Sequence, residues 1–401
     1  MFATELLRAL PKTDLHVHLD GSLRLSSLIE LARERKVALP SQTEAGLNEL
    51  IFKEKYASLA EYLTGFGYSC AVLQDAEALE RAAYELARDN LDEGVYYVEV
   101  RFAPQLHMRP GFGYVEVLRA VDRGLARARS EHEASDAVRL RGEPSFRYGI
   151  IVCAMRKFTA GFSTWFRQLF ESLPECPTRE RYAMAALDLA RAAVRARDEE
   201  GLPVVAFDLA GEEAGYPAER YEDAFRYAQE HFLKKTVHAG EAYGPESIYQ
   251  AVSVLDADRI GHGSHLFSAE SINTPGIANR QGYVQALAEY IADRRITVEV
   301  CITSNLQTTP SIARPEDHPF RQMLDANLSA TLCTDNRLVS HTSVTREYEI
   351  ATAAFNMNEK ELRNTIIYGF KRSFFPGNYA EKRAYVRGII TYYDQVMARA
   401  R

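Results

Sequence analysis

Residues 13–19 read Thr-Asp-Leu-His-Val-His-Leu, an apolar, β-rich segment with two histidines, His16 and His18, two positions apart. Side chains two apart on a strand point to the same face, so both imidazoles leave this segment on one side. A second such segment, residues 330–334, lies near the other end of the chain and is followed by Asp335. The first and last strands of a closed barrel are neighbours, whereas those of an open sheet generally are not. Metal-binding residue types on both segments therefore favour a closed barrel.

Six further apolar segments lie between these two, and we expect each to be a strand: residues 95–103, 146–154, 203–209, 235–239, 259–263 and 297–302. Helical patterns separate them. For example, Asp75 is a good helix N-cap, and Leu79, Ala83 and Leu86 follow it at helical spacing. Strands that alternate with helices predict a parallel sheet, and eight such units predict a TIM (β/α)8 barrel. The alternative is a doubly wound open sheet, which is disfavoured because no Gly-rich phosphate loop follows the first strand.

The chain is expected to fold as one domain over residues 1–401, since barrels with insertions reach this size. Helical patterns in residues 359–401 add extra helices after the eighth unit. Residues 38–73 are an insertion rich in large apolar side chains, namely Phe52, Tyr56, Leu59, Tyr62, Phe66 and Tyr68. These form either an apolar lid over the catalytic face or a small satellite core, and the sequence leaves both open.

The composition excludes several classes of partner. The net charge of −7 and a pI near 5.9 argue against nucleic acid, and no apolar run is long enough to cross a membrane. The arginine-dense stretches 119–129 and 191–197 have helical spacing and are expected to be solvated helix faces. The five cysteines form no Cys-x-x-Cys pair, which favours free thiols in a reducing compartment. We therefore expect a soluble cytoplasmic protein, while its oligomeric state stays open.

Four side chains at the ends of the predicted strands can bind a divalent metal, and they are His16, His18, His238 and Asp335. They converge if the barrel forms, because the carboxyl ends of its strands share one mouth. Three imidazoles and one carboxylate suit Zn²⁺ with a position left for water, whereas a structural zinc is more often closed by cysteines. Zn²⁺ lowers the pKa of bound water from about 15.7 to about 7. The fourth strand carries no lysine to bridge a second metal, so we predict one Zn²⁺ per chain.

Three further residues are candidates for the chemistry. Glu241, three residues after His238, can donate a proton to a ring nitrogen, which contributes roughly 10²–10⁴-fold to a rate; otherwise it is a solvated glutamate at a helix start. His262 ends the sixth predicted strand and is placed to hold the attacking hydroxide, with a fourth metal ligand or a packed core histidine as alternatives. Gly211 leaves backbone N–H groups open to a planar ligand, unless it is an ordinary strand-to-loop glycine.

Several motifs resemble, in order and spacing, those of the adenosine deaminase family in the amidohydrolase superfamily. They are His16-Val17-His18-Leu19-Asp20-Gly21, Val98-Glu99-Val100-Arg101-Phe102-Ala103-Pro104, Asp208-Leu209-Ala210-Gly211-Glu212-Glu213, Val237-His238-Ala239-Gly240-Glu241, Arg259-Ile260-Gly261-His262-Gly263 and Thr334-Asp335. The resemblance runs from about residue 13 to about residue 346. It implies a zinc-dependent hydrolase that deaminates adenosine and 2′-deoxyadenosine, both small-molecule purine nucleosides, to the inosine nucleosides and ammonia in purine salvage.

The resemblance also implies roles for single residues. The metal ligands would be His16, His18, His238 and Asp335, the last also being catalytic. Glu241 would protonate the purine N1, His262 would orient the hydroxide, and the backbone of Gly211 would bind N3. Asp20 would hold the ribose 5′-hydroxyl, and His18 would also lie against the substrate.

One position departs from the family pattern. Asn336 stands where the family has an aspartate that faces the purine N7. An asparagine amide donates a hydrogen bond without any protonation change, so purine binding remains compatible with it. The alternative substrates are a modified adenine nucleoside, such as 6-aminodeoxyfutalosine, and adenine itself. A carboxylate at Asp20 argues for a sugar hydroxyl and against a phosphate. A barrel that keeps the metal only as a binding module is the non-catalytic alternative, and the presence of Glu241 and His262 argues against it.

Overall fold

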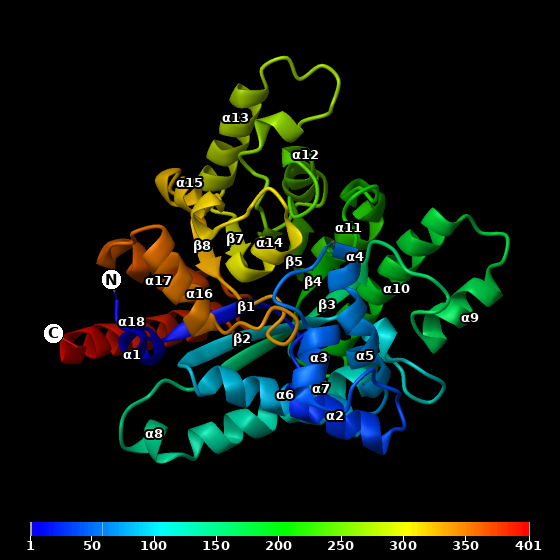
Figure 1. Cartoon of the computed structure of the whole chain (residues 1–401), viewed down its shortest axis with the longest axis horizontal. Coiled ribbons are helices and arrows are strands. Elements are labelled where there is room, and N and C mark those ends of the chain that lie inside the picture. Colours follow the sequence, from blue (N-terminus) through cyan, green and yellow to red (C-terminus); the bar gives the residue numbers. More distant parts are fainter. Residues whose placement is uncertain (1, 58, 401) are drawn as a thin grey trace.

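The computed structural model describes residues 2–57 and 59–400, without the side chains of residues 59 and 60. Eight parallel strands lie side by side in chain order (Figure 1). They are β1 (Lys12–His18), β2 (Val95–Phe102), β3 (Arg147–Met155), β4 (Val204–Ala210), β5 (Lys234–Ala239), β6 (Arg259–His262), β7 (Thr297–Val300) and β8 (Ser329–Leu332). The segment after β8 closes the ring on β1, because His18 N–H donates to the carbonyl of Asp335 (2.7 Å) and Asp335 N–H donates to that of His16 (2.8 Å). The predicted TIM (β/α)8 barrel with extra helices is confirmed.

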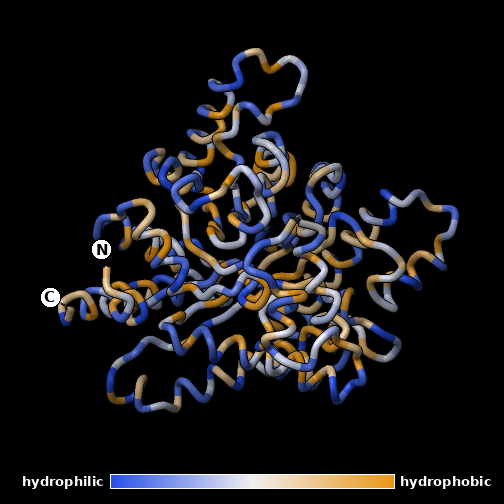
Figure 2. Tube along the Cα trace, in the orientation of Figure 1, coloured by the Kyte–Doolittle hydropathy of each residue, from blue (hydrophilic) through white to orange (hydrophobic). Residues whose placement is uncertain are grey.

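Helices surround this barrel (Figure 1). They are α1 (Thr4–Ala9), α2 (Leu25–Glu34), α3 (Glu44–Leu50), α4 (Leu59–Tyr62), α5 (Thr64–Val72), α6 (Ala76–Leu91), α7 (Tyr114–Glu133), α8 (Asp136–Arg139), α9 (Thr164–Ser172), α10 (Thr178–Asp198), α11 (Glu222–Glu230), α12 (Pro245–Tyr249), α13 (Arg280–Asp293), α14 (Ile302–Thr308), α15 (Phe320–Asp325), α16 (Val344–Ala354), α17 (Glu359–Arg372) and α18 (Tyr379–Ala400). Hydrophilic residues dominate the peripheral loop that carries α8 (Figure 2). The eight strand positions agree with prediction, but the seventh strand is shorter than expected, because the chain turns into α14 at Ile302.

The pair α6 and α7 shows how the sequence builds the outer layer. The carboxylate of Asp75 caps α6 by accepting from the N–H of Ala78 (2.9 Å), as predicted, and the face with Leu79 and Leu86 is buried. A Cβ at Gly124 on α7 would lie only 2.2 Å from the carbonyl oxygen of Glu80. The missing side chain therefore lets the two helix backbones approach closely.

The barrel interior holds a buried charge network that the sequence did not predict. The guanidinium of Arg259 bonds Glu299 Oε1 (2.6 Å) and also Glu99, while Arg101 Nη2 bonds Glu299 Oε2 (2.8 Å). Burial raises the pKa of Glu299, but the two guanidinium groups lower it well below its usual range. Glu299 Oε2 also lies 2.8 Å from Nδ1 of His16, so the network reaches the mouth of the barrel.

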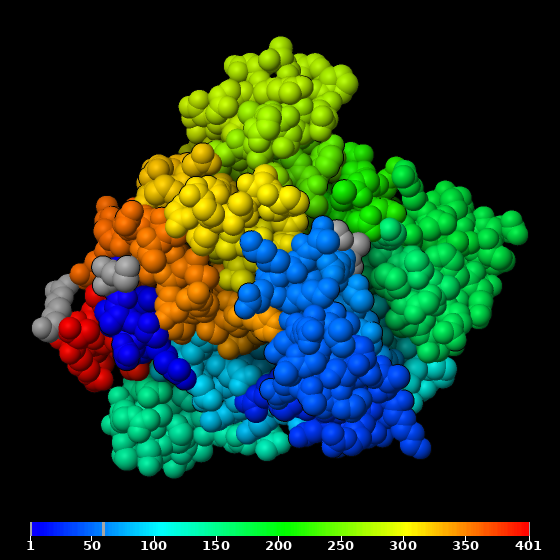
Figure 3. Space-filling view, in the orientation of Figure 1, coloured from blue at the N-terminus to red at the C-terminus, as the bar shows by residue number. Residues whose placement is uncertain are grey.

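The insertion at residues 38–73 carries α3, α4 and α5 and docks on the loop that follows β8. The hydroxyl of Tyr62 lies 2.9 Å from Oγ of Ser340, and the hydroxyl of Tyr56 donates to the carbonyl of Val339 (2.8 Å). Figure 3 shows the insertion in blue beside this loop in orange and α14 in yellow. The insertion therefore covers part of the face at which the strands end.

Four aromatic side chains of this insertion, those of Phe52, Tyr56, Tyr62 and Phe66, pack on the core of the barrel rather than in a separate satellite core, whereas Tyr68 is only partly buried. Phe52 and Tyr62 are buried in the same apolar cluster as the strands, and Tyr56 and Phe66 pack against that cluster. The side chain of Leu59 lies outside the described residues. A lid that opens and closes stays a prediction.

The arginine-rich stretch on α7 and the cysteines lie as the composition predicts. Arg123 and Arg127 on α7 make exposed ion pairs with Glu80 and Glu131, as a solvated helix face requires. The cysteines are free thiols, and all except Cys176 are buried. Across the described part of the chain, no helix combines the length and apolar character needed to cross a membrane.

Candidate active site

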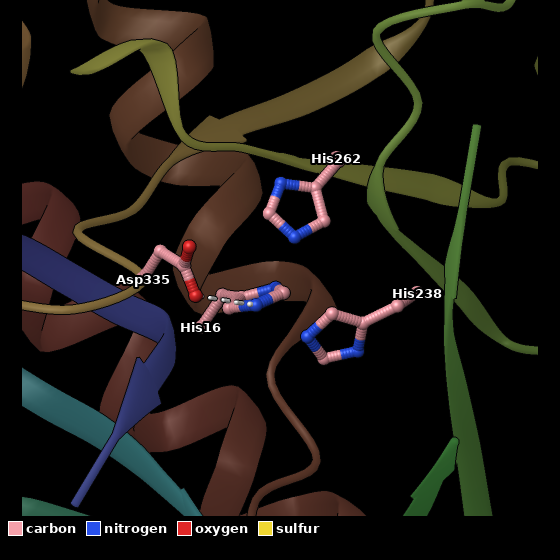
Figure 4. Close-up of side chains that lie close together, drawn as sticks. All are labelled: His16, His238, His262 and Asp335. Carbon is pink, nitrogen blue, oxygen red and sulfur yellow. Dashed lines mark ion pairs between the residues drawn. The ribbon is translucent and has the colours of Figure 1, made fainter. Parts of the chain in front are cut away.

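The ends of three strands and the segment after β8 bring four metal-binding side chains together. His16 lies on β1, His238 on β5, His262 at the end of β6, and Asp335 three residues beyond β8. One nitrogen or oxygen from each lies within 4.8 Å of the others, and all four residues are buried. Figure 4 shows the three rings and the carboxylate around a common centre. His262 and Asp335 have φ values of 66° and 60°, a strained left-handed backbone typical of functional sites.

His18 adds a fifth group at the edge of this cluster. Its Nε2 lies 3.1 Å from Nε2 of His238 and 3.5 Å from Oδ1 of Asp335. The four predicted ligands therefore do meet, but the structure also brings His262 within the same distance range. Which three imidazoles can bind a metal depends on which ring nitrogens carry a proton.

The donor set suits a divalent cation such as zinc. Nε2 of His16 is buried and has no hydrogen-bond partner among the described residues, although it lies 3.4 Å from Oδ1 of Asp335. A buried imidazole nitrogen facing a carboxylate and other imidazoles is costly unless a cation binds them. The site therefore fits the metal that the sequence predicts.

Buried carboxylates on the far side of the rings orient these ligands. Asp208 lies 3.1 Å from Nδ1 of His238, and Glu299 has the matching contact with His16. Ser304 donates to Oδ2 of Asp335 (2.6 Å). Burial raises the pKa of Asp335, but the close contact with His16 and the other neighbouring imidazoles lower it well below its usual range. Such contacts fix the ring orientation and raise ligand basicity, and they could not be paired from the sequence.

Glu241 lies in the loop after β5, and its Oε2 is 3.7 Å from Nε2 of His262. Burial, together with nearby Asp335, raises the pKa of Glu241 to about 8. A carboxyl group in this state carries a proton at neutral pH. Glu241 therefore suits proton donation to a bound ring.

A second glutamate, Glu213, holds the loop of Glu241 in place. Its two carboxylate oxygens accept from the N–H groups of Gly240 (2.7 Å), Glu241 (2.9 Å), Ala242 (2.6 Å) and Tyr243 (3.1 Å), and from the hydroxyl of Ser247. Glu213 lies in the motif at residues 208–213, and no role was predicted for it. Its only sequence signal was that motif, because the partners lie 27–34 positions away.

The predicted substrate contacts lie around the same mouth. Asp20 is buried, its Oδ1 has no hydrogen-bond partner in the described part of the chain, and burial raises its pKa to about 7. Gly211 follows β4 with φ of 91°, a conformation that L side chains rarely adopt. The amide nitrogen of Asn336 donates to the hydroxyl of Tyr62 (2.8 Å), so the insertion holds this side chain. That contact was not predicted.

Histidines and an aspartate that meet at the strand ends of a (β/α)8 barrel are typical of metal-dependent hydrolases. The chain belongs to the adenosine deaminase family, whose model matches residues 11–392. It is a hydrolytic deaminase that acts on C–N bonds.

Similar proteins agree with this assignment. Adenosine deaminase 1 of Streptomyces coelicolor is 36% identical over 386 residues, which cover 96% of this chain and 87% of that protein. The adenosine deaminase of Mycobacterium avium is 34% identical over 376 residues, which cover 93% of this chain and 92% of that protein. A zinc-bound amidohydrolase from Burkholderia ambifaria shares the fold, with a TM-score of 0.76 over 99% of this chain and 95% of that chain, at 20% identity.

Proposed function

We propose that this chain hydrolyses the 6-amino group of adenosine and 2′-deoxyadenosine, releasing ammonia and the inosine nucleoside. The observation that carries the proposal is the buried Glu241 beside His262 and a buried His/Asp cluster, within a chain that matches curated adenosine deaminases. Water adds to C6 of the purine, and the amino group leaves from the same carbon after it gains a proton.

The cofactor in this proposal is one zinc ion per chain, held by His16, His18, His238 and Asp335. When bound, zinc supplies Lewis-acid chemistry that lowers the pKa of a water molecule to about 7. The unpartnered Nε2 of His16 and the low pKa of the Asp335 carboxyl support this assignment.

The remaining residues bind and protonate the purine. Glu241 donates its proton to N1, which makes C6 more electrophilic, and His262 orients the attacking oxygen. Gly211 binds N3 through its backbone N–H, and Asn336 donates to N7 with the amide hydrogen that Tyr62 leaves free. Asp20 accepts a hydrogen bond from the 5′-hydroxyl.

A modified adenine nucleoside, such as 6-aminodeoxyfutalosine, is the second candidate substrate, and adenine is a third. The observation that favours a modified nucleoside is Asn336, which replaces the family's aspartate and is held by Tyr62 from the insertion. To distinguish these substrates, the purified protein is incubated with a panel of 6-aminopurines and the rate of ammonia release is measured. We expect adenosine and 2′-deoxyadenosine to react fastest. A protein that ignored adenosine but accepted a 5′-extended analogue would overturn the proposal.

Replacing Asp20 with alanine is expected to change the choice between sugars. A hydrogen bond to a charged group is worth roughly 1.5–3 kcal/mol, or about 10- to 150-fold in kcat/KM. Above the pKa of about 7, where Asp20 is charged, Asp20→Ala should therefore narrow the preference for adenosine over 5′-deoxyadenosine by about that factor. AMP should be a poor substrate of the parent protein, because its phosphate would face a carboxylate. Equal discrimination before and after the change would show that Asp20 does not contact the 5′-hydroxyl.

A further inference from the structure

A chain of buried hydrogen bonds ends on the ring of His262. The backbone N–H of Phe320 donates to Nδ1 of His318 (3.1 Å). Nε2 of His318 lies 3.1 Å from Oδ1 of Asn305, and Nδ2 of Asn305 lies 3.1 Å from Nδ1 of His262. All three side chains are buried. This relay joins the first turn of α15 to the active site through α14.

The backbone group at the start of the relay sets the direction of every bond in it. A backbone N–H can only donate, so Nδ1 of His318 is a bare acceptor and its proton is on Nε2. The Nε2–H group of His318 therefore donates a hydrogen bond to Oδ1 of Asn305. The NH2 group of Asn305 then faces His262. Because an NH2 group donates, Nδ1 of His262 is also a bare acceptor. The proton of the neutral His262 ring is therefore on Nε2.

The surroundings of His318 and Asn305 support this assignment of the ring protons. Its side chain is almost completely buried, and burial lowers its pKa to about 3, which keeps the ring neutral. Asn305 is fully buried in α14, where its backbone N–H bonds the carbonyl of Cys301 (2.9 Å) and its own carbonyl accepts from Thr309 (2.9 Å). Asn305, in the middle of the relay, is therefore held in place by the backbone hydrogen bonds of α14.

We propose that Asn305 and His318 are positioning residues that hold His262 with its proton on Nε2, so that His262 is a hydrogen-bond donor in the site. The Nε2–H group points to the region of Glu241, whose Oε2 is 3.7 Å away. This ring has no lone pair for a metal at Nε2, and its other nitrogen is occupied by Asn305. His262 is thus neither a metal ligand nor a general base, and His18 is left as the third imidazole ligand. The proposal rests on the proposed function at one point only. That point is the acceptor of the Nε2–H hydrogen bond, which is the attacking oxygen.

The state of the His262 ring can be measured without any substrate. In protein labelled with ¹⁵N-histidine and loaded with zinc, the shifts of the two ring nitrogens distinguish N–H, bare and metal-bound nitrogen, and His262→Gln identifies the signals. We expect N–H at Nε2 and a bare Nδ1. A bare or metal-bound Nε2 in the parent protein would overturn the proposal.

Two nearly isosteric variants test the relay itself. Asn305→Asp places a carboxylate against Nδ1 of His262, which forces a proton onto that nitrogen, whereas His318→Gln keeps an N–H donor toward Asn305. We expect Asn305→Asp to move the proton signal to Nδ1 and to lower kcat roughly 10²-fold, the size of losing one preorganised donor. KM and zinc content should stay near parental, and His318→Gln should keep both the signals and the rate.

Outcomes for the relay and for the proposed function are separable. Unchanged His262 signals in Asn305→Asp would refute the relay, and a parental rate in that variant despite a moved proton would refute the role of His262 as a hydrogen-bond donor in the site. If the parent protein deaminated no purine but showed the expected ring signals, the relay would stand and the proposed function would fall.

Discussion

Replacing Glu241 with glutamine is expected to lower kcat by at least about 10²-fold, the size of losing general acid catalysis, while zinc remains bound. Glutamine keeps the shape of the side chain and its N–H donors, but it cannot transfer a proton to the purine N1. The loop should stay in place, because Glu213 binds its backbone rather than the side chain of Glu241. Steady-state kinetics and metal analysis of the same preparation measure both effects.

Glu270→Gln is a matched control for this change, because Glu270 is exposed in the loop that follows β6. It should keep the parental rate. A Glu241→Gln protein that turned over adenosine near the parental rate would remove Glu241 from the mechanism, whatever its metal content.

The same residue predicts a pH dependence. Burial raises the pKa of Glu241 to about 8, and only the protonated carboxyl can act as the acid. Loss of this proton should therefore lower the rate as pH rises through this pKa. A bound dication favours the carboxylate, so the decline should begin at or below pH 8 in the loaded enzyme. The pH profile of kcat measures it, and a rate that climbed steadily through this range would contradict a protonated Glu241.

The features that could be predicted from the sequence are those determined by a single local segment. Each strand is a short apolar run, and the chemical residues lie at or just after the strand ends, so the barrel order placed His16, His238, His262 and Asp335 together. The helix α14 was missed because the apolar residues 297–302 read as one strand, although the chain turns at the end of β7.

Features that depend on pairing between distant segments could not be predicted. Glu213 and Asn305 are polar residues in a loop and a short helix, where a solvated position is the usual expectation. Their partners became known only from the fold, because the hydrogen bonds of Asn305 reach His262, 43 positions earlier, and His318, 13 positions later. Residue type and local spacing carry no information about such pairs. The residues that tune the site were therefore harder to find than those that form it.

Replacing His16 with alanine is expected to abolish tight zinc binding and to reduce activity by more than roughly 10³-fold, because water without the metal has a pKa near 15.7 rather than about 7. His16 is fully buried, and Glu299 orients it so that Nε2 faces the cluster. The parent protein should contain close to one zinc per chain, since His16, His238, His262 and Asp335 lie together at the mouth of the barrel and β4 carries no lysine to bridge a second metal.

His132→Ala is the matched control for the loss of a buried histidine. His132 lies at the end of α7, where its Nε2 bonds the carbonyl of Pro144 (2.9 Å), away from the mouth of the barrel. This variant should keep its zinc and its rate, so any general effect of removing a buried imidazole is measured separately. Removal of zinc by a chelator should likewise inactivate the parent protein, and one equivalent of zinc should restore it. Two tightly held metals in the active protein, or full activity of His16→Ala, would refute the mononuclear site, because three imidazoles and one aspartate then could not account for the chemistry.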